Sequence, residues 1–248
     1  MKLSHVTFGT GSAISFLHGF TQTKESWLPV VEQLPLGHQY TCIDAPGHGQ
    51  STDGKRTLVE AGNDVAETMS QGILVGYSMG ARIALHTAFQ HPKTVTALVL
   101  ISGTAGIDDD NERKQRRESD EALANRISDI GVPDFITEWL SNPMFSGLSP
   151  ASADVPSRCR NIAEGLGNSL RYAGTGTQTP LWDVLPTLAM PVLLIAGEND
   201  QKFVDLARRM SSLIPNCELR IITGVGHTCH LEDITSYTAL FQDWLSRI

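Results

Sequence analysis

The chain has 248 residues, of which 41% are hydrophobic, so it is long enough for one large domain with a sizeable core. Its formal charge of −8 argues against binding to nucleic acid or to an anionic membrane surface. The four cysteines show neither a C-x-x-C pair nor zinc spacing, and the chain shows neither a signal peptide nor a membrane-spanning run, so it is predicted to be cytoplasmic and to lack a metal.

Short apolar runs alternate with longer helical patterns in the first hundred residues. Strands are predicted at residues 13–17, 40–44, 73–75 and 95–101, each a nearly continuous apolar segment. Helices are predicted at residues 27–34, 58–69 and 79–90, the first with Pro29 in its opening turn, where proline is tolerated. Only residues 2–10 precede the first strand, so any N-terminal hairpin is expected to be short.

The alternation stops at about Ile107 and resumes after Pro186. The residues between them are charged, helical and loop-rich, and then two more apolar strands, 192–196 and 218–222, alternate with helical patterns at 203–213 and 234–245. Apolar strands separated by helices imply a mostly parallel sheet that is covered on both faces. We therefore expect an α/β core formed by residues 1–106 and 187–248, with a helical cap inserted at residues 107–186.

The pentapeptide Gly76-Tyr77-Ser78-Met79-Gly80 lies between a predicted strand and a predicted helix. This is the layout of a nucleophile elbow, in which a tight turn exposes the serine oxygen. The residues two before and two after the serine must lack a side chain there, and glycine meets that demand. The pentapeptide alone could also be a surface turn, so its context has to decide between the two interpretations.

Polar residues follow the other predicted strands too, and parallel sheets bind ligands beyond the carboxyl ends of their strands. His18 follows the first strand, Asp44 the second, Asp200 the strand after the cap and His227 the last. Ser78, Asp200 and His227 thus occur in the Ser…Asp…His order of the alpha/beta hydrolases. In such a triad His227 would take the proton of Ser78, and Asp200 would orient His227.

Each of the two triad partners of the serine has an alternative. Asp200 could instead cap the helix near Phe203, and Glu198 is a competing acid. His230 is a competing base, and with His227 it could form a metal pair, although no third ligand is evident. His227 is the better candidate because it directly follows a strand and a Gly-x-Gly turn.

Two backbone N–H groups are predicted to form an oxyanion hole, a site that binds a developing negative charge on oxygen. One belongs to Met79, directly after the serine, and the other to Phe20, in the loop after the first strand. His18 and His48 lie in glycine turns and are expected to shape loops rather than to take part in chemistry.

These motifs make the whole chain resemble the alpha/beta hydrolases, and narrower ones resemble the 2-succinyl-6-hydroxy-2,4-cyclohexadiene-1-carboxylate synthases of menaquinone biosynthesis. One departure is Ala81, where that family more often has a second glycine. The motifs that carry the narrower resemblance lie in the elbow helix, in the cap and around Asp200, and they are Gly76-Tyr77-Ser78-Met79-Gly80-Ala81-Arg82, Glu112-Arg113-x-x-Arg116-x-x-x-Asp120-Glu121-x-Leu123-Ala124, Glu138-Trp139-x-x-x-Pro143-Met144-Phe145, Arg158-x-x-Asn161, Leu170-Arg171-x-x-Gly174-Thr175-Gly176-x-Gln178-x-x-Leu181-Trp182 and Ala196-Gly197-Glu198-x-Asp200-x-Lys202-Phe203.

The resemblance implies an α/β-hydrolase fold and a lyase that needs no cofactor. Such an enzyme eliminates pyruvate from 2-succinyl-5-enolpyruvyl-6-hydroxy-3-cyclohexene-1-carboxylate, with Ser78 in the position of the base that removes a ring proton. By position, Arg116 and Arg158 match arginines of the family's cap. Without the resemblance, each would be read as a solvated cap residue.

The substrate has three carboxylates, which guanidinium groups match well. Arg82 lies one helical turn after Ser78 and would be costly to bury without an anionic partner, unless it forms a salt bridge within the protein. Tyr77 and Trp139 are expected to pack against the ligand, although Tyr77 could equally be part of the core. The sequence leaves the choice between monomer and homo-oligomer open, and also the choice between a menaquinone and a phylloquinone pathway.

Two other functions remain open from the sequence. The same triad would serve a serine hydrolase, either an esterase or an enzyme that hydrolyses carbon–carbon bonds. A ligand-binding protein without catalysis could also use this fold. The complete triad disfavours the non-catalytic ligand-binding protein. The set of arginines disfavours the serine hydrolase, since an ester or ring-fission substrate rarely needs three cations.

Overall fold

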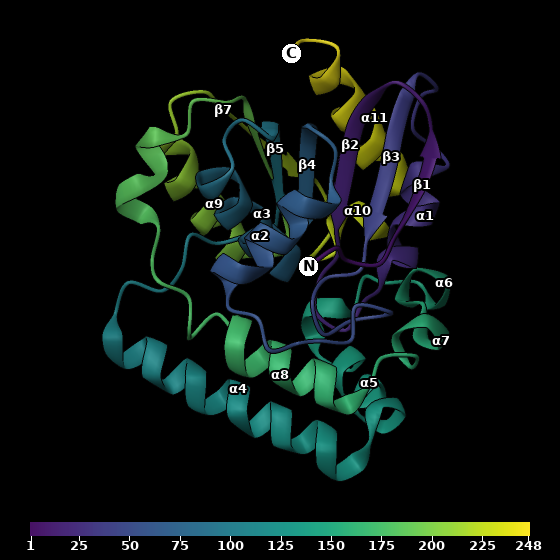
Figure 1. Ribbon diagram of the computed structural model, residues 1–248, viewed down its shortest axis with the longest axis vertical. Coiled ribbons are helices and arrows are strands. Elements are labelled where there is room, and N and C mark those ends of the chain that lie inside the picture. The colour runs from purple at the N-terminus through teal and green to yellow at the C-terminus, as the bar shows by residue number, and fades with distance from the viewer.

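A single sheet of seven strands runs through the computed structural model, which describes residues 1–248 (Figure 1). Its order is β1-β3-β2-β4-β5-β6-β7, and only β1 is antiparallel to its neighbour. The predicted mostly parallel α/β sheet is therefore confirmed. The strands are β1 (His5–Gly9), β2 (Ser12–Leu17), β3 (His38–Ile43), β4 (Gly72–Tyr77), β5 (Val95–Ile101), β6 (Val192–Gly197) and β7 (Cys217–Ile222).

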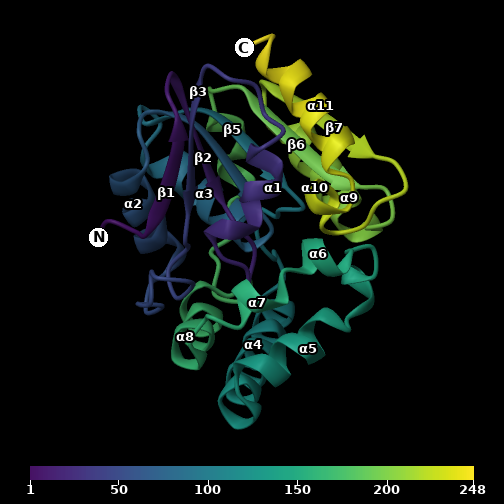
Figure 2. The ribbon, with the colours of Figure 1, turned by 90° about the vertical axis from the view of Figure 1, so that its right-hand side faces the viewer.

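Helices cover both faces of the sheet (Figure 2). One face packs against α2 (Leu58–Thr68), α3 (Met79–Gln90) and α9 (Gln201–Leu213). The other packs against α1 (Leu28–Val31), α10 (Cys229–Glu232) and α11 (Ile234–Leu245). Local sequence fixes where some of these helices begin, since Thr57 and Glu60 form a reciprocal capping box at the start of α2.

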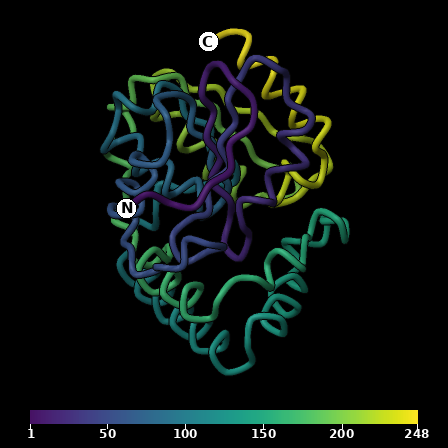
Figure 3. Tube along the Cα trace, turned by 45° about the vertical axis from the view of Figure 1, so that its right-hand side comes forward, coloured from purple at the N-terminus to yellow at the C-terminus, as the bar shows by residue number.

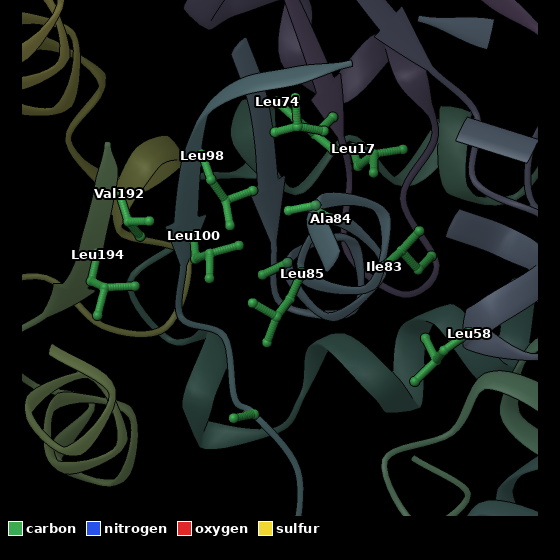
Figure 4. Close-up of a cluster of buried hydrophobic side chains, with 14 of the residues drawn as sticks. Leu17, Leu58, Leu74, Ile83, Ala84, Leu85, Leu98, Leu100, Val192 and Leu194 are labelled. Atoms are coloured by element: carbon green, nitrogen blue, oxygen red, sulfur yellow. The ribbon is translucent and has the colours of Figure 1, made fainter. Parts of the chain in front are cut away.

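Alternation along the strands divides the core into two parts. Leu74 and Leu98 point to the α3 side, where they meet Ile83, Ala84 and Leu85 (Figure 4). The adjacent residues in these strands point to the α11 side, where the buried aromatic rings of Tyr237, Phe241 and Trp244 lie. Because successive strand residues face opposite sides, strands buried on both faces are apolar throughout, which is the pattern seen in the sequence.

A helical cap lies over one end of the sheet. It is formed by the chain segment that follows β5 and precedes β6, and Figure 3 shows it as the teal and green helices below the sheet. The side chain of Asp109 accepts hydrogen bonds from two N–H groups at the start of its long helix α4. A small separate core packs α4 and α5 against α8. The helices of this segment are α4 (Asp110–Ile130), α5 (Val132–Leu140), α6 (Pro150–Ala153), α7 (Val155–Arg158) and α8 (Ala163–Ala173), with 3-10 turns at Pro143–Phe145 and Trp182–Thr187.

Residues 2–10 contain a single short strand, which forms no hairpin with the next one, because β2 is already paired on both edges and β1 takes the open edge of β3. One prediction for the N-terminal region needs correction. The helix predicted at 27–34 is a 3-10 turn, Lys24–Trp27, followed by one turn of α1, which ends at Val31. Pro35 disfavours helical geometry at the residue before it, so the helix cannot extend through Leu34.

Candidate active site

Ser78 occupies the turn between β4 and α3 with a φ of 51°. Positive φ is costly for a residue with a side chain and persists where the surrounding structure enforces it. The turn also leaves no room beside the serine, because a Cβ atom on Gly76 would overlap the carbonyl oxygen of Gly80, and one on Gly80 would overlap that of Leu17. The pentapeptide therefore has the geometry of a nucleophile elbow.

Ser78, His227 and Asp200 form one hydrogen-bonded chain. His227 Nε2 lies 3.1 Å from Ser78 Oγ, and His227 Nδ1 lies 2.6 Å from Asp200 Oδ2. The hydroxyl of Ser102 donates to the carbonyl oxygen of His227, and the Phe203 ring packs on the imidazole with 4.6 Å between centroids. These contacts hold His227 between an acid and a hydroxyl, which is the arrangement that activates a serine.

The alternatives to these residues have other places in the structure. Glu198 accepts a hydrogen bond from the N–H of Gly224, and the Asp200 side chain forms no cap on α9. The His230 ring lies buried between Trp27 and Tyr77, and burial lowers its pKa to about 3. No three His, Cys, Asp or Glu side chains come together in a group that could hold a metal ion.

Two unpaired backbone N–H groups lie next to the serine. Met79 is the first residue of α3, so its N–H has no partner within the helix. Phe20 follows β2, the strand beside β4, and its N–H forms no hydrogen bond within the protein. Both therefore lie at the junction of β2 and β4. The chain continues from β2 to β3 on one side of this junction and from β4 to β5 on the other, so the strand order reverses here, and open α/β sheets bind ligands at such a point.

Buried histidines shape the loop that carries Phe20, as the sequence suggested. His18 Nε2 accepts from the N–H of Ala45, and His48 Nε2 accepts from the N–H of Thr21. Burial lowers the pKa of both rings, that of His48 to about 3, so both are neutral near pH 7. A neutral ring can accept these backbone hydrogen bonds, whereas an imidazolium cannot.

A cavity of about 700 Å³ opens beside the serine, between the sheet and the cap. Its size suits a small-molecule ligand. It is lined by the three residues of the hydrogen-bonded chain, by Phe20 and Met79, and by all five predicted substrate-binding residues, which are Tyr77, Arg82, Arg116, Trp139 and Arg158.

Two of the arginines are buried without an acidic partner. Arg82 is 7% exposed and donates to the carbonyl oxygen of Ala173 at 2.7 Å, and it forms no salt bridge, although the charge of Asp120, which is bound to Arg116, acts to raise its pKa. Arg158 is 2% exposed and donates to the carbonyl oxygen of Ala153 and to the hydroxyl of Thr21. Burial lowers the pKa of each guanidinium to about 10, and anions in the cavity would relieve this cost.

The other predicted ligand contacts are more varied. Arg116 is half-exposed and donates to Asp120 at 2.8 Å, so its charge is already paired. Tyr77 was predicted either to contact the ligand or to belong to the core, and it occupies both environments, because it lines the cavity and its ring also packs in the core against His230. Trp139 stacks on Phe135 and lines the cavity, and its indole N–H has no partner.

Sequence reasoning gave no binding role to several polar residues of the cavity wall, among them Gln22, Lys202 and Arg209. Lys202 stands two residues after Asp200, which is a signal that could have been used. Arg209 lies on α9. Its Nη1 is 2.6 Å from Asp108 Oδ2, and its guanidinium carbon is 3.7 Å from the centroid of the Trp182 ring. Gln22 carried no signal, because a glutamine in a loop is ordinarily solvated.

Comparison with known proteins identifies the family of this chain. The model of the alpha/beta hydrolase family matches residues 16–236. The putative 2-succinyl-6-hydroxy-2,4-cyclohexadiene-1-carboxylate synthase of Bacillus subtilis is 36% identical over 95% of this chain and 91% of its own, and the synthase of Photorhabdus laumondii is 34% identical over 93% and 84%. The structure of MenH from S. aureus superposes with a TM-score of 0.91 at 28% identity, covering 100% of this chain and 99% of that one.

A thermophilic esterase from Thermogutta terrifontis is also similar in structure, with a TM-score of 0.82 over 99% of this chain and 93% of the esterase. At 22% identity that likeness speaks for the fold alone. None of the helices combines the length and the apolar character that crossing a membrane requires.

Proposed function

This chain belongs to the alpha/beta hydrolase family and, within it, to the 2-succinyl-6-hydroxy-2,4-cyclohexadiene-1-carboxylate synthases, and we propose from its site that it eliminates pyruvate from 2-succinyl-5-enolpyruvyl-6-hydroxy-3-cyclohexene-1-carboxylate. The reaction is a step of menaquinone biosynthesis. Its substrate is a small polycarboxylate, and the enzyme is a carbon–oxygen lyase.

The names of substrate and product define the bonds that change. The ring 3-ene becomes a 2,4-diene, so C2 loses a proton, the double bond moves to C2–C3 and a second one forms at C4–C5. The C5–O bond breaks, and the enolpyruvyl group leaves with the electron pair, takes up a proton and becomes pyruvate. The C2 proton is acidic because it lies next to the ketone of the succinyl group, so the first step forms an enolate.

Ser78 and His227 supply the base in this proposal. With 3.1 Å between Nε2 and Oγ, His227 can take the hydroxyl proton as Ser78 removes the proton from C2. Asp200, 2.6 Å from Nδ1, stabilises the imidazolium that forms. The same imidazolium then holds the proton that the leaving enolpyruvate needs, so the catalytic residues return to their starting state without water or a cofactor.

The N–H groups of Phe20 and Met79 would bind the enolate oxygen. Donors that are already in place gain most when charge develops on an oxygen in a site closed to water. Neither group is paired in the protein, and both line the cavity with Ser78, which supports their binding an enolate oxygen while C2 faces the serine.

One observation carries the choice of a lyase over an esterase: two buried arginines, Arg82 and Arg158, donate to no carboxylate and share the cavity with the serine. Leaving such charges unpaired is costly, and a substrate with several carboxylates would pair them. An ordinary ester offers no such groups. Arg82, Arg158 and, after exchange of its bond with Asp120, Arg116 are assigned to the three carboxylates.

The test is release of pyruvate, followed with lactate dehydrogenase and NADH, when the purified protein receives the proposed substrate. The expected result is stoichiometric pyruvate together with the absorbance of the conjugated diene. Absence of pyruvate, with rapid cleavage of short p-nitrophenyl esters, would instead identify a serine hydrolase. We also place the enzyme in the cytoplasm, a proposal supported by its four free cysteines.

A further inference from the structure

Gln22 lies at the end of the tight turn that carries Phe20. Its backbone N–H donates to the carbonyl oxygen of Gly19 at 3.2 Å, and its side-chain Oε1 accepts from the N–H of Gly19 at 2.8 Å. A backbone N–H can only donate, so the amide oxygen must face Gly19 and the amide nitrogen must point the other way. The orientation of the Gln22 amide is therefore fixed by its own turn.

The other half of this amide has no partner. Gln22 is 2% exposed, and its Nε2 is buried without any hydrogen bond within the protein. Buried donors of this kind are rare, because an unpaired one costs about 1–3 kcal/mol. The residue lines the 700 Å³ cavity together with Phe20, Tyr77 and Ser78. An unpaired donor on the wall of a ligand cavity indicates that the ligand supplies the acceptor.

We infer that Gln22 is a substrate-binding residue, whose side-chain N–H donates to an anionic oxygen of the substrate next to the oxyanion-hole N–H of Phe20. The inference rests on the proposed function, which supplies such oxygens as carboxylates and as the enolate. Gln22 adds a neutral donor of fixed direction to the three arginines, and it thereby sets the orientation of the substrate rather than its charge.

Two substitutions separate this role from a structural one. Gln22→Glu keeps an oxygen that accepts from Gly19 but replaces the donor by a negatively charged acceptor. Gln22→Met removes both the acceptor and the donor at similar size. Gln71→Glu is the matched control, because Gln71 is an exposed glutamine outside the cavity. Pyruvate release gives kcat and KM for each, and thermal unfolding gives Tm.

Gln22→Glu is expected to lower kcat/KM by about 10- to 100-fold, the range of one hydrogen bond to a charged group, and to lower Tm as well, because it buries a negative charge. A rise in KM alone assigns the bond to a carboxylate, and a fall in kcat assigns it to the enolate. Gln22→Met should lose as much activity and some Tm. Gln71→Glu should keep its activity, and any fall in its Tm should reflect only the lost bond from Gln71 Nε2 to the carbonyl oxygen of Lys93.

Full activity of Gln22→Met, or of Gln22→Glu at a pH at which the introduced carboxyl is ionised, overturns the inference, because neither methionine nor a carboxylate can donate. A loss in Gln22→Met alone would show that only the bond to Gly19 matters, and would overturn it as well. If the unaltered protein releases no pyruvate, the proposed function fails, and this inference falls with it. Pyruvate release by the unaltered protein with no change in Gln22→Glu refutes the role of Gln22 alone.

Discussion

Asn161 ties the cap to the loop that carries Phe20, and Asn161→Ala is expected to damage both stability and catalysis. Its Oδ1 accepts from the N–H of Gly49 at 2.7 Å, and its Nδ2 donates to the carbonyl oxygens of Thr21 at 2.7 Å and Arg158 at 2.9 Å. Thr21 has a φ of 68°, a costly conformation for a β-branched residue, and it is fully buried. The bond from Asn161 is one of the contacts that hold it there.

The size of the effect follows from the groups that lose their partners. Alanine would leave the N–H of Gly49 and the carbonyl oxygen of Thr21 unpaired, at about 1–3 kcal/mol each, so the free energy of unfolding should fall by about 2–6 kcal/mol. Relaxation of Thr21 would also displace the neighbouring N–H of Phe20. Loss of one oxyanion-hole donor costs about 10²–10³ in kcat, and we expect a fall of at least about tenfold.

Urea unfolding and pyruvate release measure the two effects. Asn168→Ala is the control, since Asn168 is also a buried cap asparagine, at 8% exposed, but its side chain forms no hydrogen bond and does not line the cavity. It should change kcat less than twofold. If Asn161→Ala kept its kcat and lost less than about 0.5 kcal/mol, the network around Thr21 would not position the proposed oxyanion hole.

Ser78→Ala should lower kcat by at least about 100-fold without changing Tm, and a full rate in the pyruvate assay would exclude Ser78 as the base. Arg82→Met should lower kcat/KM about 10- to 100-fold but leave the protein at least as resistant to urea, because it removes a buried charge without an acidic partner; unchanged kcat/KM would remove Arg82 from the site. The free energy of unfolding should fall as the pH is lowered from 6.5 to 4. In this range the histidines of the unfolded chain bind protons, whereas buried histidines of the folded protein stay neutral. Each such histidine contributes a slope of up to about 1.4 kcal/mol per pH unit. A flat urea-unfolding profile over this range would contradict that expectation for the histidines whose pKa burial lowers, which are His18, His48 (to about 3), His86 (to about 4) and His230 (to about 3).

Much of the fold could be predicted because its determinants are local. The strands β4, β5 and β6 are apolar throughout since helices cover both faces of the sheet, and that pattern is visible in the chain. The N-terminal strand was harder. Which partner β1 finds depends on which sheet edge is free, and that is known only once β2 has paired on both sides.

The candidate site shows the same division. Chain order and strand ends sufficed to select Ser78, Asp200 and His227, and the structure brings the three within hydrogen-bonding distance, while their catalytic roles stay a proposal. Chain order could not show that Arg82 lacks a carboxylate partner, because the groups around it come from other segments, whereas the Arg116–Asp120 pair is four residues apart on one helix and is visible in the chain. It also could not show that Gln22 is buried.

The sequence by itself determined the buried strands of the sheet, the elbow and the order of the triad residues, because each depends on the residue types within a few positions of one strand or turn. Only the tertiary structure decided which polar groups are left without partners. Whether the N–H of Phe20, the amide of Gln22 or the guanidinium of Arg82 is free to bind a ligand depends on every atom packed around it. Those atoms come from segments far apart in the chain, so no local pattern records the result.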